Sequence, residues 1–535
     1  MAGIRFPDLR AIARFLSPTA RRRETFRKSW GCIGDADGWL STRLFDLKRT
    51  SNPRVLDDKT WRDLELDAIF HRLDTTISKP GSQYLYNQLR TFEFDSDRSA
   101  VRYAAYRLLE KDERLREALQ LALSGLEVDS AAYIVEALFG SPPSSFPHPR
   151  LLYAWALCCL GALTLVVPLG LWWILPVILC ANGIVIYRTP SQLRRHTEAL
   201  IQGPRLLAVG DRLASIEPYG ESIAQLTALR AEGRKRARLR DELRWLTVLS
   251  DSSAIWAGLS QAANWFCLAQ LVVYSRTVRR FTYSRHEWIS TFELVASVDA
   301  AIAVASYLHH KTVHCPVTVT SDATIEITGG YHPLIAHPVP NSIALMGRSA
   351  LITGSNMTGK TTYMKMAGVN IVLGHTLGFC LARSATLPRS PVMVSVRSDQ
   401  SVESGKSGYS AEVQAIRDFV DRAATGECRI FILDEPFRGT NTLERIAVAK
   451  AVLDALSADA QVLATTHDVE LQQLLTDRFD FFYFREDPDV KGFFDFKVRR
   501  GISRERNAIR VLERMGFPSK IVSAALTQLE HLSKP

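Results

Sequence analysis

Several common signals are missing from this 535-residue chain. Its eight cysteines form no Cys-x-x-Cys pair, so neither a zinc site nor a redox motif is indicated, and we expect a reducing environment. Residues 1–30 are rich in arginine and lack the continuous apolar run of a cleaved secretory signal. Hydrophobic residues make up 47% of the chain and charged residues 23%, which excludes a chain that is disordered throughout.

Charge is also missing from one long stretch, residues 151–187. Pro168 and Gly170 divide it into halves of about 17 residues, near the lower limit for a helix that spans a bilayer. Arg150 and Arg188 flank the stretch, and basic residues at both outer ends favour a cytoplasmic location for both. We therefore expect a transmembrane hairpin. The alternative is a buried helical hairpin or a re-entrant loop in a soluble core.

The rest of the N-terminal half has a helical pattern. Residues 55–150 place apolar side chains at three-to-four spacing, and residues 189–250 also indicate helices, with breaks expected at Gly203-Pro204 and at 218–220. A second uncharged stretch, 252–275, contains two glutamines and an asparagine. We expect a core helix there and leave its contact with a membrane open.

The charge that is present is mostly positive. A net charge of +10 and an isoelectric point near 9.2 favour a polyanionic partner, which is either nucleic acid or an anionic membrane surface. Basic residues gather in residues 1–30, as an arm on a membrane or a frayed terminus, and in 230–240. The second cluster could meet phosphates or lipid headgroups, or be a solvated helix face.

From about residue 315, short apolar runs alternate with helical segments, which predicts an α/β sheet domain. A strand-like run there leads into Gly354-Ser355-Asn356-Met357-Thr358-Gly359-Lys360-Thr361, a full match to G-x-x-x-x-G-K-[ST]. Glycines let such a loop turn its N–H groups toward phosphates, and a helix from Thr362 adds positive potential. Lys360 should reach the β- and γ-phosphates, and Thr361 should offer its hydroxyl to Mg²⁺.

Two later strand-like runs end in groups that suit the same chemistry. One ends in Asp434 and Glu435; the first suits the Mg²⁺ shell, and the second could orient or deprotonate the attacking water. The other ends in His467, which could sense the γ-phosphate. A lone histidine is usually structural, but the order of loop, Asp-Glu and His favours an ATP-hydrolysing site.

These segments resemble the MutS family of DNA mismatch repair ATPases. Residues 353–364 read TGSNMTGKTTYM, against T-G-P-N-M-G-G-K-S-T-Y-M in the family. Residues 434–442 read DEPFRGTNT and 464–467 read ATTH, against the family's Asp-Glu segment with its G-R-G-T-S-T continuation and its A-T-H segment. Weaker matches lead into the adenine pocket, close it, and mark the helical core: residues 331–334 and 338–341, residues 496–501 and 516–518, and residues 73–85.

The resemblance implies an α/β P-loop ATPase domain of the ABC type, attached to an all-helical core that the transmembrane hairpin interrupts. ATP and Mg²⁺ would be the ligands, held by residues 354–362, with Val339 in the adenine pocket. Glu435, Lys360 and His467 would be catalytic. The resemblance also implies a homodimer in which Ser407 touches the partner's γ-phosphate, so that ATP closes the dimer and hydrolysis opens it.

The departures from the family pattern bear on function. Phe437 stands where the family has Gly, Asn441 where it has Ser, and Val339 where an aromatic usually meets adenine. No mismatch-reading domain fits before residue 50. We therefore expect either an ATPase of DNA-repair type at the cytoplasmic membrane, with DNA as ligand and its ATPase domain facing the cytoplasm, or a membrane mechanoenzyme acting on a protein or lipid. A scaffold with negligible turnover is a third reading, against which the intact Glu435 argues.

These observations together predict five segments. They are a basic arm (1–50), a first helical part (51–150), the hairpin (151–187), a second helical part (188–312) and the ATPase domain (313–535).

Overall fold

The structure is a computed structural model that describes residues 18–32, 34, 38–51, 54–140, 148–188, 191–216, 223–242, 254–355, 358–396, 408–485, 494–502 and 516–532. The chain forms two compact units. The first consists of residues 1–53, 70–90 and 104–310, and the second of residues 54–69, 91–103 and 311–535. The second unit thus contains two short segments from early in the chain.

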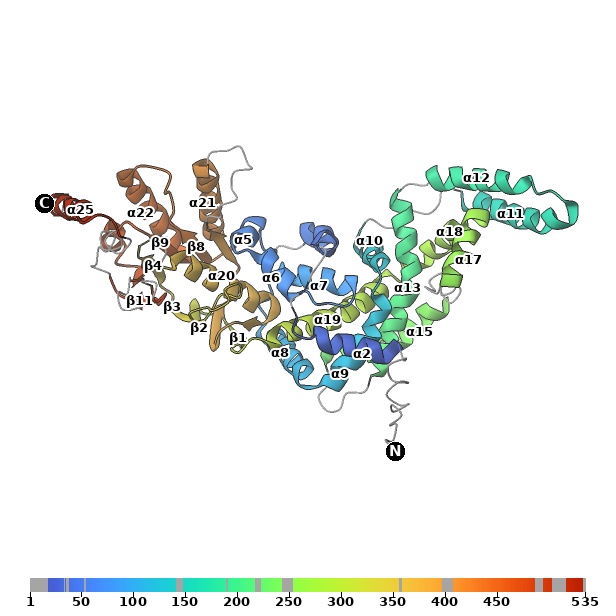
Figure 1. Ribbon diagram of the computed structural model, residues 1–535, viewed down its shortest axis with the longest axis horizontal. Coiled ribbons are helices and arrows are strands. Elements are labelled where there is room, and N and C mark those ends of the chain that lie inside the picture. Colours follow the sequence, from blue (N-terminus) through green and yellow to red (C-terminus); the bar gives the residue numbers. More distant parts are fainter. Residues whose placement is uncertain are drawn as a thin grey trace, which may run out of the picture. The chain divides into compact units, whose positions relative to one another are not determined.

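The first unit is built of helices (Figure 1). Two further helices, α6 and α8, run across the division between the units. The bounds are α2 (Pro18–Ser29), α3 (Gly38–Ser41), α4 (Arg43–Lys48), η1 (Arg49–Ser51), α6 (Leu66–Leu73), α7 (Lys79–Leu89), α8 (Ser96–Lys111), α9 (Glu113–Leu123), η2 (Ser124–Leu126), η3 (Asp129–Tyr133), α10 (Ile134–Phe139), α11 (Pro149–Leu169), α12 (Ile174–Arg188), α13 (Ser191–Ser215), α14 (Ala224–Ala231), α15 (Gly233–Glu242), α17 (Ala254–Cys267), α18 (Ala269–Tyr283) and α19 (Arg285–His309).

Helix α19 forms the centre of this unit and fixes the start of α7. Asp299 of α19 is fully buried and accepts hydrogen bonds from the backbone N–H groups of Ile77 and Ser78, at 3.0 and 2.8 Å. Ser78 in turn caps α7 by accepting from the N–H of Gly81 at 3.0 Å. Burial raises the pKa of Asp299 to about 6. This buried contact therefore fixes the backbone of the segment 73–85 at Ile77 and Ser78.

Helix α13 corrects one prediction. The break expected at Gly203-Pro204 is wrong, because α13 continues through both residues. A Cβ on Gly203 would lie 2.8 Å from the ring of Trp288 in α19, so the glycine allows close packing that holds the helix together around its proline. The other expected break, at 218–220, lies outside the described residues.

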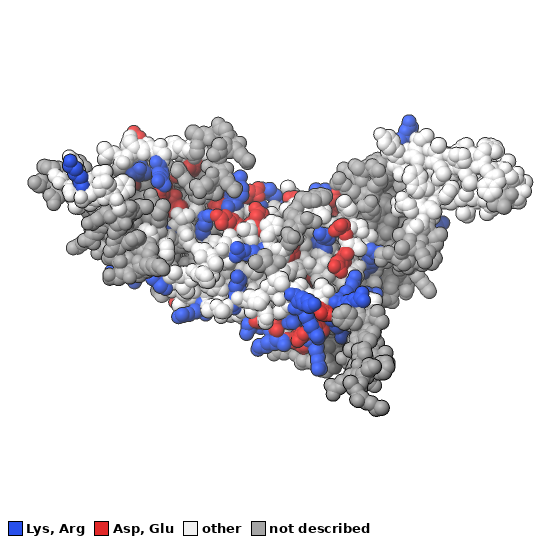
Figure 2. Space-filling model, in the orientation of Figure 1, with Lys and Arg blue, Asp and Glu red and all other residues white. Residues whose placement is uncertain are grey.

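Helices α11 and α12 occupy most of the stretch 151–187 and meet at a turn where Gly170 has φ +65°. Among the described residues, two helices are long and apolar enough to cross a membrane, α11 and α19. In α19, 72% of the apolar segment is buried inside the protein, whereas in α11 the buried share of the segment Pro149–Val166 is 17%. The surface over α11 and α12 is almost free of charged side chains (Figure 2).

The second uncharged stretch, 252–275, also differs from the expected single core helix. It contains the whole of one helix, α17, and the first part of the next, α18, and Leu268 between them has φ +52°. The side chain of Asn264 accepts a hydrogen bond from the N–H of Gln270 at 3.3 Å, which stabilises this corner. Trp265 is 41% exposed, so the stretch is only partly buried.

The second unit is mixed α/β, which confirms the sheet domain expected from about residue 315. Its two sheets have the strand orders β3-β2-β6-β1-β5 and β11-β10-β4-β9-β8-β7. The bounds are α5 (Asp58–Asp63), β1 (Cys315–Thr320), β2 (Thr324–Gly330), β3 (Asn341–Met346), β4 (Ser349–Thr353), α20 (Lys360–Leu377), β5 (Phe379–Cys380), β6 (Ser384–Pro388), β7 (Val392–Ser395), α21 (Gly408–Ala424), β8 (Ile430–Asp434), α22 (Thr442–Asp459), β9 (Gln461–Thr466), α23 (Glu470–Leu474), β10 (Phe479–Tyr483), β11 (Arg499–Arg500) and α25 (Ser519–Leu532).

Five strands of the six-stranded sheet, β10, β4, β9, β8 and β7, are parallel, and helices cover both faces (Figure 1). Phe431 of β8 packs with residues of α21 and α22, whereas the next residue, Ile432, packs near Gly368 of α20. Alternate residues of a strand face opposite sides, so the sheet is buried on both. Its carboxyl edge brings the ends of β4, β8 and β9 together, since Thr353 pairs with Thr466 and Asp434 with Thr465.

Candidate functional site

A loop between β4 and α20 lies at this carboxyl edge. Gly354 has φ +150° and Gly359 has φ +102°, conformations that residues with a Cβ rarely adopt. A Cβ on Gly354 would also lie 3.0 Å from the carbonyl oxygen of Phe484. Helix α20 begins directly after Gly359, so the positive end of its dipole borders the loop. Asn356 and Met357 lie outside the described residues.

Lys360 is the first residue of α20 and is buried. Its Nζ donates to the carbonyl oxygens of Gly354 and Ser355 at 2.9 and 3.0 Å, and lies 3.6 Å from Oε1 of Glu435. Burial lowers the pKa of Lys360, although the charges of Glu435 and Asp434 oppose this. The loop thus holds one ammonium group inside its own curve.

Asp434 ends β8 and is held from two sides. Thr361 Oγ1 donates to its Oδ2 at 2.7 Å, and Thr465 Oγ1 donates to its Oδ1 at 2.5 Å. A hydroxyl and a carboxylate in contact are the hard oxygen donors that Mg²⁺ prefers, and Mg²⁺ commonly takes only one or two of them from a protein. In the part of the chain that the structure describes, no group of three or more His, Cys, Asp or Glu side chains could hold a metal. The residues therefore fit Mg²⁺ shared with phosphates.

Glu435 lies beside this pair in a left-handed backbone conformation, with φ +47°. Its Oε1 lies 2.5 Å from Nε2 of His467, and its Oε2 lies 3.2 Å from the guanidinium of Arg438. Burial alone would raise the pKa of Glu435, but the hydrogen bond with His467 and the charges of His467, Lys360 and Arg438 outweigh it and lower that pKa. The carboxylate is thus an ionised acceptor at neutral pH.

The structure brings together the predicted Lys360, Thr361, Asp434, Glu435 and His467. His467 Nε2 also lies 3.4 Å from Nζ of Lys360, so the lysine, the glutamate and the histidine form one cluster. The sixth predicted residue of this kind, Ser407, lies outside the described residues.

Two residues of the cluster had no predicted role. Arg438 pairs with Glu435, and Thr465 links the two acidic residues, because its Oγ1 donates to Asp434 and accepts from the N–H of Glu435 at 2.9 Å. Both stand inside recognised segments, DEPFRG and ATTH. The position of Thr465 at the end of the neighbouring parallel strand was a usable signal, whereas the role of Arg438 depends on the backbone turn at Glu435 and Phe437.

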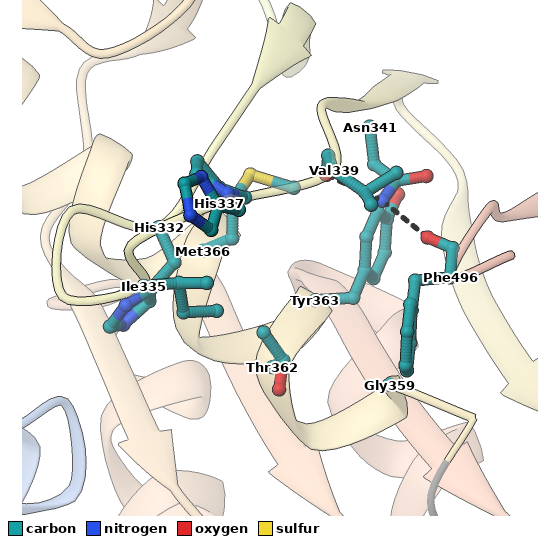
Figure 3. Close-up of a pocket in the computed structure, with 11 residues that line it drawn as sticks. His332, Ile335, His337, Val339, Asn341, Gly359, Thr362, Tyr363, Met366 and Phe496 are labelled. Atoms are coloured by element: carbon teal, nitrogen blue, oxygen red, sulfur yellow. Dashed lines mark hydrogen bonds between the residues drawn. The ribbon is translucent and has the colours of Figure 1, made fainter. Parts of the chain in front are cut away.

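A pocket of about 180 Å³ lies beside the loop (Figure 3). It is lined by His332, Ile335, His337, Pro338, Val339, Asn341, Gly359, Thr362, Tyr363, Met366 and Phe496. Asn341 Nδ2 donates to the carbonyl oxygen of Phe496 at 2.8 Å, which links two segments far apart in the sequence at one side of the pocket. The predicted residues Val339 and Thr362 both line it, and Gly359 belongs to both the pocket and the loop.

The two departures from the family pattern after Glu435 have structural roles. Phe437 has φ +63°, and its ring is buried in the core against α21 and α22. Its N–H donates to Glu412 at 2.6 Å. Asn441 caps α22 by accepting from the N–H of Glu444 at 3.0 Å, as a serine would do.

One protein family matches the part of the chain that contains the loop, Asp434, Glu435 and His467. Residues 350–533 match the family MutS domain V. The DNA mismatch repair protein MutS of Natronomonas pharaonis is 30% identical over 265 residues, which is 47% of this chain and 30% of that protein. The DNA mismatch repair protein MutS 2 of Halobacterium salinarum is 31% identical over 248 residues, 44% of this chain and 28% of that protein.

A third relative is the DNA mismatch repair protein MSH3 of Phaeosphaeria nodorum, 29% identical over 258 residues, 45% of this chain. The chain spans 23% of that protein, and less than a third of the length of each of these three relatives. The resemblance to the MutS family read from the nucleotide-loop and Asp-Glu segments is confirmed: residues 350–533 match MutS domain V, and relatives named MutS are about 30% identical over nearly half of this chain.

Proposed function

We propose that this chain binds and hydrolyses ATP with Mg²⁺ at the carboxyl edge of its parallel sheet. One observation carries the proposal: the loop lysine, its neighbouring threonine and the Asp-Glu pair converge within hydrogen-bonding or ion-pairing distance. The fit to MutS domain V, a domain of proteins named for DNA mismatch repair, supports it.

Each side chain then has a defined task. The loop amides and Lys360 bind the phosphate oxygens and stabilise the charge that grows on them. Thr361 and Asp434 would hold Mg²⁺, which when bound neutralises phosphate charge. Glu435 accepts the proton of a water whose oxygen bonds to the γ-phosphorus, while the bond to the bridging oxygen breaks and ADP leaves. Arg438 and His467 orient that carboxylate.

The pocket beside the loop would receive the purine base. Its walls are largely apolar and include the rings of Tyr363 and Phe496 and the side chain of Val339 (Figure 3). Such a mixture of apolar walls and a few polar groups is typical of small-molecule sites.

An ATPase assay with three proteins tests the proposal. Glu435→Gln should lower the turnover rate by about 100-fold or more while ATP binding persists, because the amide keeps the shape but accepts no proton. Lys360→Ala should weaken ATP binding itself. Equal rates in wild type and Glu435→Gln would contradict the role of Glu435, and no hydrolysis in wild type would leave a nucleotide-binding scaffold.

We also propose that α11 and α12 form a transmembrane hairpin with both ends on the cytoplasmic side, which puts the ATPase domain at the cytoplasmic face. The exposed apolar side chains of α11 and its low burial support this reading. An integral protein would stay in the membrane pellet after alkaline carbonate extraction. Release into the supernatant would contradict the hairpin.

The working form is proposed to be a homodimer that ATP closes and hydrolysis opens, with Ser407 completing the partner's site and DNA, mismatched or branched, as ligand. The relatives' names and the net charge of +10 support DNA. The exposed apolar hairpin favours the alternative, a membrane mechanoenzyme that acts on a protein or lipid.

ATPase rates with duplex, mismatched and single-stranded DNA at two salt concentrations separate the DNA-binding ATPase from the membrane mechanoenzyme. A salt-sensitive change supports DNA, and indifference to every DNA supports the alternative.

A further inference from the structure

We infer that the corner between α17 and α18, residues 264–272, is a re-entrant membrane element that lies in the lipid beside the α11–α12 hairpin. The inference rests on the proposed insertion of that hairpin and adds a second, shallower insertion to it. The ligand of this surface is the acyl and interfacial region of a bilayer.

Contacts with the hairpin set the depth of the corner. Ser275 Oγ donates to the hydroxyl of Tyr153 at 2.9 Å, and the guanidinium of Arg276 lies 5.6 Å from the centre of that ring. Tyr153 is one helical turn from Arg150, so the middle of α18, at Ser275, lies at the charged, cytoplasmic border of the hairpin. Leu268 lies about two turns further along, roughly 10 Å deeper if α18 runs along the bilayer normal.

A second set of contacts gives the same depth independently. Asn182 of α12 donates through Nδ2 to the carbonyl oxygens of Trp265 and Phe266, both at 2.9 Å. Asn182 lies less than two turns before Arg188, roughly 9 Å along the helix axis from the basic end. Two helices of the hairpin therefore place the corner at one level, inside the apolar zone that their arginines delimit.

The corner has the hydrogen bonds that its backbone carbonyl groups would need in lipid. A broken helix leaves carbonyl groups without helical partners, and each is strongly unfavourable in hydrocarbon, where no water can bond to it. Asn182 satisfies two of them, is fully buried itself, and has its Oδ1 occupied by the indole N–H of Trp155 at 2.7 Å. Leu268, at the turn, is 1% exposed. Irregular backbone at membrane depth is tolerated only when protein buries it in this way.

The outer face of the corner is uncharged. No charged residue occurs between Ala254 and Ser275, and the first is Arg276, at the border. Trp265 is 41% exposed on this face and presents a large, mostly apolar ring. The polar Gln261 on α17 lies about as far from the corner as Ser275 does, so it falls at the border as well. The surface has the order of an interface followed by lipid.

Spin labels on the full chain in lipid nanodiscs test the inference. One label replaces Trp265, a second replaces Leu165 on the exposed face of α11, and a third replaces Tyr283, which is 85% exposed beyond Arg276. The exposed or partly exposed native cysteines are first changed to alanine; they are Cys32, Cys158, Cys180 and Cys267. Oxygen partitions into lipid and a nickel chelate into water, so their relative access to each label reports depth.

We expect the labels at 265 and 165 to be reached several-fold better by oxygen than by nickel, and the label at 283 to show the reverse. Nickel access at 265 with lipid exposure at 165 would overturn the inference and leave the hairpin standing. Nickel access at 165 would overturn both. Poor access of both probes to 265 would mean that protein, either a second copy or another partner, covers the corner, and this too overturns the inference.

A second variant tests the part played by Asn182. Asn182→Leu keeps the size of the side chain but removes both donated hydrogen bonds, so the label at 265 should move toward the nickel-accessible range while the label at 165 stays in lipid. The ATPase rate, whose machinery lies in the other unit, serves as the folding control. An unchanged 265 label in this variant would contradict the proposed role of Asn182.

Discussion

Phe437 combines a left-handed backbone with a buried aromatic ring, two properties with opposite effects on stability. Replacing it with the family's glycine relieves roughly 1 to 2 kcal/mol of backbone strain. The same change removes a ring from a packed core, which costs about 3 to 5 kcal/mol. Phe437→Gly should therefore lower the free energy of unfolding by about 1 to 4 kcal/mol, measurable by urea denaturation. A more stable variant would show that the ring contributes little.

His375 supplies a prediction about pH. Its ring is fully buried beside Phe92 and Phe94, and burial lowers its pKa to about 3. In the unfolded chain the pKa of histidine is about 6.5. Between these values the unfolded state binds a proton that the folded state refuses, so stability falls as the pH falls from about 6.5 toward 3, by about 1.4 kcal/mol per unit.

His375→Leu removes that titration and is the matched comparison. Between pH 7 and pH 5.5, urea denaturation should show the wild type losing about 1.4 kcal/mol more than the variant. Parallel losses in the two proteins would mean that the imidazole takes up its proton without unfolding.

At the same scale, the site was readable because its residues stand at fixed offsets from strand ends. Lys360, Asp434, Glu435 and His467 each follow an apolar run, and parallel strands put such positions on one edge. Arg438 was missed because its role depends on the backbone turn that Glu435 and Phe437 make, and a left-handed phenylalanine has no sequence signature.

At the scale of helices and strands, the start of α7 depends on one glycine. A Cβ on Gly81 would lie 2.2 Å from Oδ2 of Asp299, the group that accepts from Ile77 and Ser78. Gly81→Ala should cost about 2 to 4 kcal/mol, because the carboxylate must leave its buried donors. Gly233→Ala is the control, since its nearest neighbour would be 3.8 Å away, at Arg236. Thermal unfolding of the two variants measures the difference, and similar midpoints would refute the clash.

The helix breaks show where local pattern stopped being informative. Gly203-Pro204 looked like a break but lies inside α13, since packing against Trp288 outweighs the local preference. Leu268 looked like the interior of a helix but separates α17 from α18, since the side-chain amides of Asn264 and Asn182 stabilise the corner. Trp288 and Asn182 are far along the chain from the positions that they stabilise. Asn264 is close in sequence, but spacing does not tell where its side chain points.

At the scale of the whole molecule, the α/β unit is not continuous in sequence. Residues 54–69 and 91–103 belong to it, and α5 packs on the edge strand β7. The N–H of Val394 donates to Thr60 Oγ1, and the N–H of Val396 to Asp63, both at 2.9 Å. The sequence pattern predicted α5 only as a helix, because the residues of α5 do not indicate that it packs against β7, more than 300 residues later.

A fragment that starts at residue 311 should consequently be less stable than the same unit in the full chain. Without α5 the backbone donors of β7 lose buried partners and the strand is left uncovered, which favours aggregation. Sedimentation of the fragment, compared with one to which residues 54–103 are fused, measures this. Equal solubility and equal melting temperatures would show that the early segments add nothing.

The separation of Thr60 and Val394 along the sequence also affects the timing of folding during synthesis. They are 334 positions apart, and a ribosome adding about 5 to 20 residues per second needs roughly 20 to 70 seconds to make the second after the first. Throughout that interval α5 has no strand to cover, while the segments of the helical unit up to residue 310 are already emerging. The early segment of the α/β unit must therefore wait in the nascent chain, exposed to chaperones, until its strand is translated.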